Sequence, residues 1–227
     1  LALNKWVQTS YTNRLFVQDV DMDEDGEPTG ASAPFEELSG TYQYKLKLSN
    51  GNNISTGIVV TDILETGPNM QWQGTLVSFD TSYAESLGFK PEVTYAKTSS
   101  PAAGSWTDDP TGAKAVRIDF GDGILAEGQE LYILINMQAP AGLENVGKLT
   151  ENGYSASFTM IDSASGEETK WDELTSNYVQ VKLSKPRYNV LLDKKDEISD
   201  AVLSGAVFEL IDSKGTVVAQ GETNDKG

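Results

Sequence analysis

The side chains able to do chemistry in this chain are amines, carboxyl groups and carboxamides. Its 227 residues include neither cysteine nor histidine. Without cysteine there is no disulfide, no thiolate chemistry and no cysteine-type zinc site. Without histidine there is no imidazole base and no Ser-His-Asp triad. An enzyme with a pair of carboxylates remains as the catalytic alternative, but Asp and Glu are so abundant here that no single pair is informative.

Three polar residues stand at positions where burial would change their chemistry. Lys5 lies between Leu3 and Val7 in an alternating segment, Asp62 ends an apolar strand, and Asn177 starts the last strand of the first domain. Burial disfavours a charged ammonium, so a buried lysine can become a neutral nucleophile. Burial also keeps a carboxylic acid protonated, so that it can polarise a carboxamide and move protons. The alternative is a solvated Lys5, a turn-capping Asp62 and an Asn177 bonded to its own backbone.

Charge and hydropathy limit the partners. The chain has 34 acidic and 17 basic residues, which gives a formal net charge of -17. Such a polyanion is repelled by nucleic acid and by anionic lipid, so we expect neither as a partner. No apolar run reaches the roughly 18 residues that a membrane-spanning helix needs. Leu1 is not a natural start, so we expect a secretory signal upstream of this sequence.

Apolar and polar residues alternate with a period of two through most of the chain, which predicts strands. Glycine, proline and Asp/Asn clusters separate them at the spacing of a β-sandwich. A short helix is expected at 82–87, stopped by Gly88, and a joint between domains at 185–187. The expected strands, besides the segment around Lys5, are 42–48, 57–64, 72–79, 91–97, 115–120, 131–137, 154–161 and 177–183.

The C-terminal segment carries a motif order with a known counterpart. Its parts are Lys194-Lys195-Asp196 at the end of a first expected strand, Leu203-Ser204-Gly205-Ala206-Val207-Phe208-Glu209-Leu210 as a second strand and Gly215-Thr216-Val217-Val218 as a third. This order resembles the opening half of the collagen-adhesin B-type (Cna-B-like) repeat of Gram-positive surface proteins. The resemblance implies a truncated second β-sandwich over residues 185–227. It also implies a wall-attached stalk or pilus rather than a soluble enzyme, and the lack of cysteine suits such a surface.

The preceding part of the chain has a counterpart of its own. The segments 44–50, 59–64, 127–133 and 177–181 resemble the immunoglobulin-like repeat of bacterial surface proteins that reads YxLxVxN…VxVTDxLP. The resemblance implies an all-β, immunoglobulin-like sandwich over residues 1–184. The sequence departs from the pattern in two places, with an acidic insertion near residues 19–39 and with Glu65 where proline is usual.

The same resemblance implies a reaction. In many such sandwiches a lysine on an early strand forms an amide with an asparagine on the last strand, assisted by a carboxyl group. It therefore implies an isopeptide bond between Lys5 and Asn177, with Asp62 as the proton shuttle. Holding amine and carboxamide in contact supplies an effective molarity of ~10⁵–10⁸ M, so no cofactor is required. In the loop-entropy model such a ring would stabilise the domain by about 5 kcal/mol.

A second lysine falls at a reactive position of the C-terminal motif. Lys194 stands where the B-type repeat places its cross-linking lysine. The resemblance places the partner of that lysine beyond this sequence. The alternative is that Lys194 is an unreacted lysine.

An acidic run suggests a calcium loop. Asp21, Asp23 and Asp25 alternate, and Gly26 follows in the sixth position, as in the front of an EF-hand loop. The twelfth position is Ser32 and no helices flank the run, so it is not an EF-hand. Two interpretations stay open: a surface loop that binds Ca²⁺ through these residues and Glu27, or a solvated acidic insertion.

Tryptophans supply the remaining candidate site. Trp106 and Trp171 lie in polar contexts, where their rings could stack on sugars, although a sandwich more often buries its tryptophans.

Together these features predict a structural or adhesive module of a bacterial cell-surface protein. It would be extracellular, built of tandem domains of one polypeptide, and would contact a host or microbial surface ligand. It would not be an enzyme, except for the single self-directed cross-link. The alternative is a carbohydrate- or calcium-dependent binding module of an extracellular protein.

Overall fold

The computed structural model describes residues 1–18, 33–67, 69–187 and 192–226. The described chain divides into two compact units, Leu1–Pro186 and Arg187–Gly227. The predicted joint at 185–187 lies at this division. No helix in the described ranges has the length and apolar character that crossing a membrane requires.

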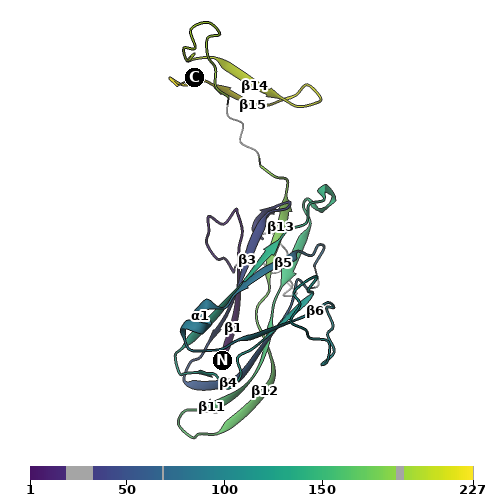
Figure 1. Cartoon of the computed structure of the whole chain (residues 1–227), viewed down its shortest axis with the longest axis vertical. Helices are drawn as coiled ribbons and strands as arrows, with labels where there is room; N and C mark the ends of the chain where they lie inside the picture. Colours follow the sequence, from purple (N-terminus) through teal and green to yellow (C-terminus); the bar gives the residue numbers. More distant parts are fainter. Residues whose placement is uncertain (19–32, 68, 188–191, 227) are drawn as a thin grey trace, which may run out of the picture. The chain divides into compact units, whose positions relative to one another are not determined.

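The regular secondary structure of the first unit is almost all strand, as the alternation predicts. Among its described residues, one α-helix, α1, covers Ser82–Ser86 and one 3₁₀ turn, η1, covers Leu143–Asn145. Its strands, drawn in Figure 1, are β1 (Ala2–Gln8), β2 (Phe35–Glu37), β3 (Thr41–Ser49), β4 (Asn53–Ile63), β5 (Thr75–Asp80), β6 (Glu92–Ala96), β7 (Ala115–Asp119), β8 (Ile124–Leu125), β9 (Glu130–Gln138), β10 (Leu149–Asn152), β11 (Ser155–Asp162), β12 (Glu168–Thr175) and β13 (Val179–Ser184).

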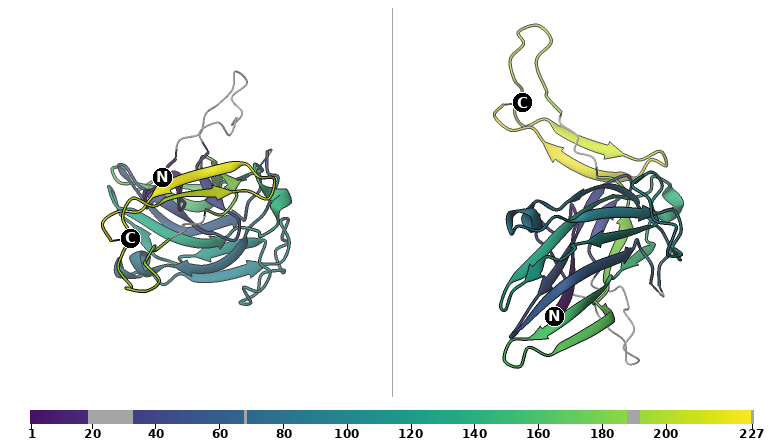
Figure 2. Two further views of the ribbon diagram at one scale, coloured as in Figure 1. Left: turned by 90° about the horizontal axis from the view of Figure 1, so that it is seen from above. Right: turned by 60° about the horizontal axis from the view of Figure 1, so that its bottom comes forward.

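These strands form three sheets around one core. A four-stranded sheet has the order β1-β3-β9-β5, and a six-stranded sheet has the order β12-β11-β4-β7-β6 with β8 paired to β4. A smaller sheet has the order β10-β13-β2. Figure 2 gives two further views of this layered arrangement. The apolar side chains that meet between the two larger sheets include Tyr44, Leu46, Leu48, Ile133, Ile135, Ile58, Val60, Val116, Ile118 and Phe158.

Strand alternation decides which residues reach this core. Along β3 and β9 every second residue is buried, because successive side chains of a strand point to opposite faces. Strand β4 breaks the alternation at Gly57, where φ is 59° and two residues occupy the space of one. This bulge in the pairing with β11 resets the phase, so that Ile58, Val60 and Asp62 all face inward.

The second unit contains a single hairpin in its described part. Strands β14 (Val207–Ile211) and β15 (Val217–Glu222) pair antiparallel. They overlap the second and third strands expected from the C-terminal motif. The end of the expected first strand, at 194–196, lies in no named strand, and its earlier part falls on 188–191, outside the described residues.

The fold confirms the all-β prediction and most of the individual strands. Each expected strand of the first domain overlaps an observed one, and the expected helix is α1. The alternation pattern did not predict β2, β8, β10 or β12. Strand β12 is exposed along nearly its whole length, so it lacks the apolar period that marks a half-buried strand.

Candidate functional site

Lys5 occupies a core position. It lies in β1, where Leu3, Lys5 and Val7 point inward, and it pairs in register with Leu46 of β3. Its side chain has no solvent exposure. A lysine is almost never buried completely unless it is paired, so its partners define a site.

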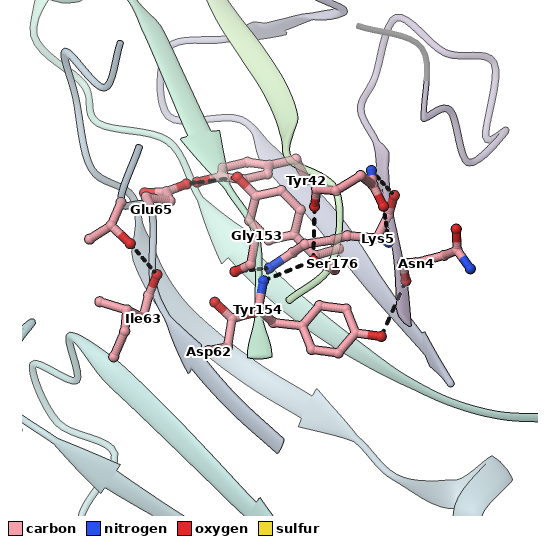
Figure 3. A network of polar contacts seen from close by, with 12 residues as sticks. Asn4, Lys5, Tyr42, Asp62, Ile63, Glu65, Gly153, Tyr154 and Ser176 are labelled. Carbon is pink, nitrogen blue, oxygen red and sulfur yellow. Dashed lines mark hydrogen bonds and ion pairs between the residues drawn. The ribbon is translucent and has the colours of Figure 1, made fainter. Parts of the chain in front are cut away.

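The main partner of Lys5 is Asp62. Lys5 Nζ lies 2.5 Å from Asp62 Oδ2, and the Asp62 side chain is fully buried. Lys5 Nζ also lies 3.4 Å from the backbone carbonyl oxygen of Gly153, which accepts a hydrogen bond from it. Figure 3 shows these groups in one polar network. The second carboxyl oxygen, Asp62 Oδ1, has no hydrogen-bond partner among the described residues.

Burial moves both members of the pair toward their neutral forms. Loss of solvation lowers the pKa of Lys5, and the nearby Asp62 charge only partly offsets it. Loss of solvation likewise raises the pKa of Asp62, opposed by the Lys5 charge, by the hydrogen bond from Lys5 and by the nearby Asn152 carboxamide. Burial therefore narrows the free-energy difference between the ion pair and a neutral amine next to a protonated carboxyl group.

Two tyrosine rings enclose the amine. Lys5 Nζ lies 4.6 Å from the ring centre of Tyr44 and 5.9 Å from that of Tyr154. The Tyr154 hydroxyl donates to the backbone carbonyl of Lys47 at 2.6 Å, which holds that ring in place. The two rings therefore help to keep water away from the amine.

Asn152, at the end of β10, meets this pair in the core. Its side chain is fully buried, and neither Oδ1 nor Nδ2 has a hydrogen-bond partner within the described part of the chain. Its neighbour Gly153 contacts the Lys5 amine. The Asn152 carboxamide lies near enough to the Asp62 carboxyl to lower the pKa of Asp62 against the effect of burial, without completing a hydrogen bond to it. A buried carboxamide without a partner costs about 1–3 kcal/mol per group, so this one needs an explanation.

The strand before Asn152 shows why its side chain points inward. Glu151 and Asn152 are successive residues, so they face opposite ways. Glu151 accepts hydrogen bonds from Gln180 Nε2 at 2.5 Å and from Asn69 Nδ2 at 3.1 Å. Glu151 is therefore paired away from the Lys5 site, and Asn152 is directed toward it.

Asn177 lies close to Lys5 but engages its main chain. It precedes β13, and its Oδ1 accepts from the Lys5 backbone N–H at 2.9 Å while its Nδ2 donates to the Lys5 carbonyl at 3.0 Å. Gln18 Nε2 also donates to this Oδ1, at 2.9 Å. The carboxamide thus continues the hydrogen bonding of β1 as a strand would, and a bond between Asn177 and the Lys5 amine stays a prediction.

The sequence reading missed Asn152 for a local reason. Asn152-Gly153 reads as a turn, and the segment Leu149–Asn152 contains three polar residues in a row. All four residues of this strand are buried. The alternation of apolar and polar residues does not reveal a strand in which every residue is buried. The only indication in the sequence was that a buried lysine needs further buried polar groups near it.

Glu65 is another fully buried carboxyl group, two residues after the end of β4. It accepts hydrogen bonds from the hydroxyl groups of Tyr42 and Tyr44 and from the backbone N–H of Gly74. Burial raises its pKa to about 7, against the lowering effect of these donors and of Lys5. Its backbone has φ 55°, in the left-handed region that non-glycine residues rarely adopt.

The other predicted site residues are not brought to this centre. Lys194 is exposed, in the second unit. Trp171 is 41% exposed on β12 and stacks on Phe158, with ring centres 6.0 Å apart. Trp106 lies in the loop after β6, and β6 and β12 form opposite edges of the six-stranded sheet. The two tryptophans therefore do not share one stacking platform.

The acidic run falls outside the described residues. Asp21, Asp23, Asp25 and Glu27 lie within 19–32. The described carboxylates do not gather into a group of three or more that could hold a metal ion. Calcium binding by the run stays a prediction.

No family model and no curated protein matches the chain. Solved structures do. The major pilin subunit BcpA of Bacillus cereus is similar over 94% of this chain and 62% of its own, with 17% identity and a TM-score of 0.36. Domains D2 and D3 of the major pilin SpaD from Corynebacterium diphtheriae match over 99% and 71%, with 14% identity and a TM-score of 0.33.

A collagen-binding domain from a Staphylococcus aureus adhesin matches over 80% of this chain and 97% of its own, with 11% identity and a TM-score of 0.38. This chain spans less than two thirds of the BcpA chain that it matches.

Proposed function

We propose that this chain is a load-bearing module of a bacterial cell-surface protein, closed by an isopeptide bond between Lys5 and Asn152. The observation that carries the proposal is a fully buried lysine amine 2.5 Å from a fully buried carboxyl group, beside a buried carboxamide without a partner. Each of these groups is costly to bury alone. Their condensation would replace them with a neutral amide.

The reaction needs only groups that the chain supplies. A proton passes from the Lys5 ammonium to Asp62, and the neutral amine attacks Cγ of Asn152. Asp62 donates its proton to the carboxamide oxygen as the tetrahedral intermediate forms. The intermediate then collapses, the Cγ–Nδ2 bond breaks, and Nδ2 leaves as ammonia with protons relayed by Asp62. One amide and one ammonia replace one amine and one primary carboxamide, without a change of oxidation state.

Asn152 suits the role of electrophile better than Asn177. The Asn177 carboxamide uses both of its polar atoms in hydrogen bonds to the Lys5 backbone. To react, it would have to give up these bonds, at a cost of about 1 kcal/mol each. The Asn152 carboxamide has no such bonds to lose within the described residues.

Such a bond would suit a protein under tension. It would join β1 near the start of the first unit to β10 near its end and close residues 5–152 into a ring. In the loop-entropy model a ring of this size stabilises by about 5 kcal/mol, and the strands inside it could not be pulled apart without breaking a covalent bond. We place the module on the outside of the cell, in tandem with other domains of the same polypeptide and in contact with a surface ligand.

The intact mass of the purified chain tests the proposal. The expected mass is lower than the sequence mass by one ammonia, in the wild type and in Asn177→Ala. The full sequence mass is expected in Asn152→Ala and in Lys5→Met. A wild-type chain of full mass rejects the cross-link. Loss of ammonia that survives in Asn152→Ala but not in Asn177→Ala returns the role of electrophile to Asn177.

A further inference from the structure

Glu65 is a buried carboxyl group that the cross-linking reaction itself does not use. It follows Asp62 by three residues, so β4 and the turn after it carry both carboxyl groups. Figure 3 shows Glu65 next to Tyr42 in the same network as Lys5 and Asp62. A left-handed backbone at Glu65 costs about 1–2 kcal/mol, which the contacts of its side chain must offset.

Tyr44 connects Glu65 to the reacting amine. The Tyr44 hydroxyl donates to Glu65 Oε1 at 3.1 Å, and the face of the same ring lies 4.6 Å from Lys5 Nζ. Tyr44 belongs to β3, which pairs with β1 beside Lys5. The position of the Glu65 carboxyl therefore determines how the ring covers the amine.

The remaining contacts of Glu65 are close-packed. The Tyr42 hydroxyl donates to the same oxygen as Tyr44, and the Gly74 backbone N–H donates to the other oxygen. A side chain at Gly74 would collide with the Tyr42 hydroxyl, so a glycine is required there. Tyr42 is held in turn by an edge-on contact with Trp72. The carboxyl group is thus fixed in place by three donors.

The charge of Glu65 acts on Lys5. The groups that influence its ionisation are Tyr42 and Tyr44 from β3, Lys5 from β1, and the backbone of Gly74. Burial raises the pKa of Glu65 to about 7, so the carboxyl group is neutral below that pH and charged above it. The Glu65 charge raises the pKa of Lys5 and so favours the ammonium, which is not a nucleophile.

We propose that Glu65 is a positioning residue that makes the Lys5–Asn152 condensation sensitive to pH: neutral Glu65 leaves the amine free to lose its proton to Asp62, and ionised Glu65 holds it as ammonium. The proposal rests on the cross-link proposed above. It predicts that the bond forms faster in mildly acidic than in mildly alkaline solution. An ordinary amine behaves in the opposite way, since its neutral fraction rises with pH.

The test measures the rate of ammonia loss against pH. Chains that carry a photocaged amine at Lys5 are uncaged in denaturant, where the site is not folded and cannot react. They are then diluted into buffers that span about pH 5.5 to 8.5, a range that lies on both sides of the pH at which Glu65 ionises. Samples are quenched at intervals, and the fraction of chains that have lost one ammonia is measured by intact-mass spectrometry. The folding rate is followed in parallel on an Asn152→Ala chain, so that slow folding is not mistaken for slow chemistry.

The wild-type rate should fall several-fold as the pH rises through about 7. Glu65→Gln, which is neutral at every pH, should abolish this fall. Tyr42→Phe removes the donor that stabilises the charged form most, so it should move the fall to higher pH. Glu36→Gln is the matched control, because Glu36 is also fully buried but accepts its hydrogen bonds from Ser10 and Glu37. It should keep the wild-type profile.

The outcomes separate the two proposals. Wild-type and Glu65→Gln chains that lose ammonia with the same pH profile overturn the role of Glu65 and leave the cross-link standing. A wild-type chain that folds and never loses ammonia overturns both. If Glu65→Gln does not fold, an unchanged profile in Tyr42→Phe still overturns the role of Glu65.

Discussion

Lys5 and Asp62 face each other inside the β-sandwich with Nζ and Oδ2 2.5 Å apart, and neither side chain reaches solvent. An ion pair in such a place is a weak source of stability, since the loss of hydration of two charges can exceed their attraction. The neutral pair avoids that cost and is also the reactive form. We therefore attribute the burial of this pair to the proposed cross-linking reaction and not to the stability that the unreacted ion pair provides.

Asp62→Asn should stop the cross-link with little change of shape. The amide cannot take the proton from Lys5 or donate one to the Asn152 oxygen. Loss of a general acid typically slows a reaction by about 10²–10⁴-fold. The intact mass of the variant should remain that of the sequence, and its free energy of unfolding should fall by about 5 kcal/mol through loss of the ring. Loss of ammonia at the wild-type rate would show that Asp62 is not the shuttle.

Asn177→Ala should weaken the fold and leave the reaction intact. The variant loses two hydrogen bonds to the Lys5 backbone, so we expect a cost of about 1–3 kcal/mol in unfolding free energy. Urea denaturation measures this cost, and the intact mass shows the reaction. An Asn177→Ala chain as stable as the wild type would mean that these bonds contribute nothing to the fold.

Stability should fall as the pH rises from about 4.5 to about 7 through the effect of Glu65. The folded state keeps a proton on this carboxyl group up to about pH 7, whereas the unfolded chain releases it near 4.5. The unfolded state is therefore favoured progressively across this window, by about 3 kcal/mol in total. Urea denaturation of the Asn152→Ala chain, with and without Glu65→Gln, isolates the effect. Equal pH slopes in the two chains would contradict it.

Calcium should raise the melting temperature if the acidic run binds it. Saturating Ca²⁺ at 100 times the dissociation constant would add about 2.7 kcal/mol to the stability, and chelation would remove it. Calorimetry with and without chelator measures this shift, and Asp23→Asn with Asp25→Asn is the matched variant. No shift on adding millimolar Ca²⁺ would identify the run as a solvated insertion.

The strands and two members of the site follow from local patterns. Lys5 points to the same side of its strand as Leu3 and Val7, which predicts that it is buried. Asp62 follows an apolar run in its strand, which predicts that Asp62 also lies in the core. The inward phase of Asp62 depends on the bulge at Gly57, and the inserted residue is visible in the sequence only as a glycine in a strand.

The rest of the site depends on tertiary pairing. Asn152 becomes buried because β10 pairs with β13. The residue pattern of Leu149–Asn152 does not predict this pairing. Asn177 was expected inside the last strand, but the strand begins at Val179, which leaves the Asn177 side chain to bond with the backbone of β1. In the sequence, Glu65 is notable only because it stands where the immunoglobulin-like repeat usually has proline. Its hydrogen-bond donors come from β3 and from Gly74, which are distant from it in sequence or lie in a loop.

Peptide mapping of the wild-type chain tests the central claim most directly. After proteolysis under denaturing conditions, tandem mass spectrometry should find the peptide that contains Lys5 joined to the peptide that contains Asn152, one ammonia lighter than their sum. Recovery of both peptides separately, at their full masses, or of Lys5 joined to Asn177, would contradict the account.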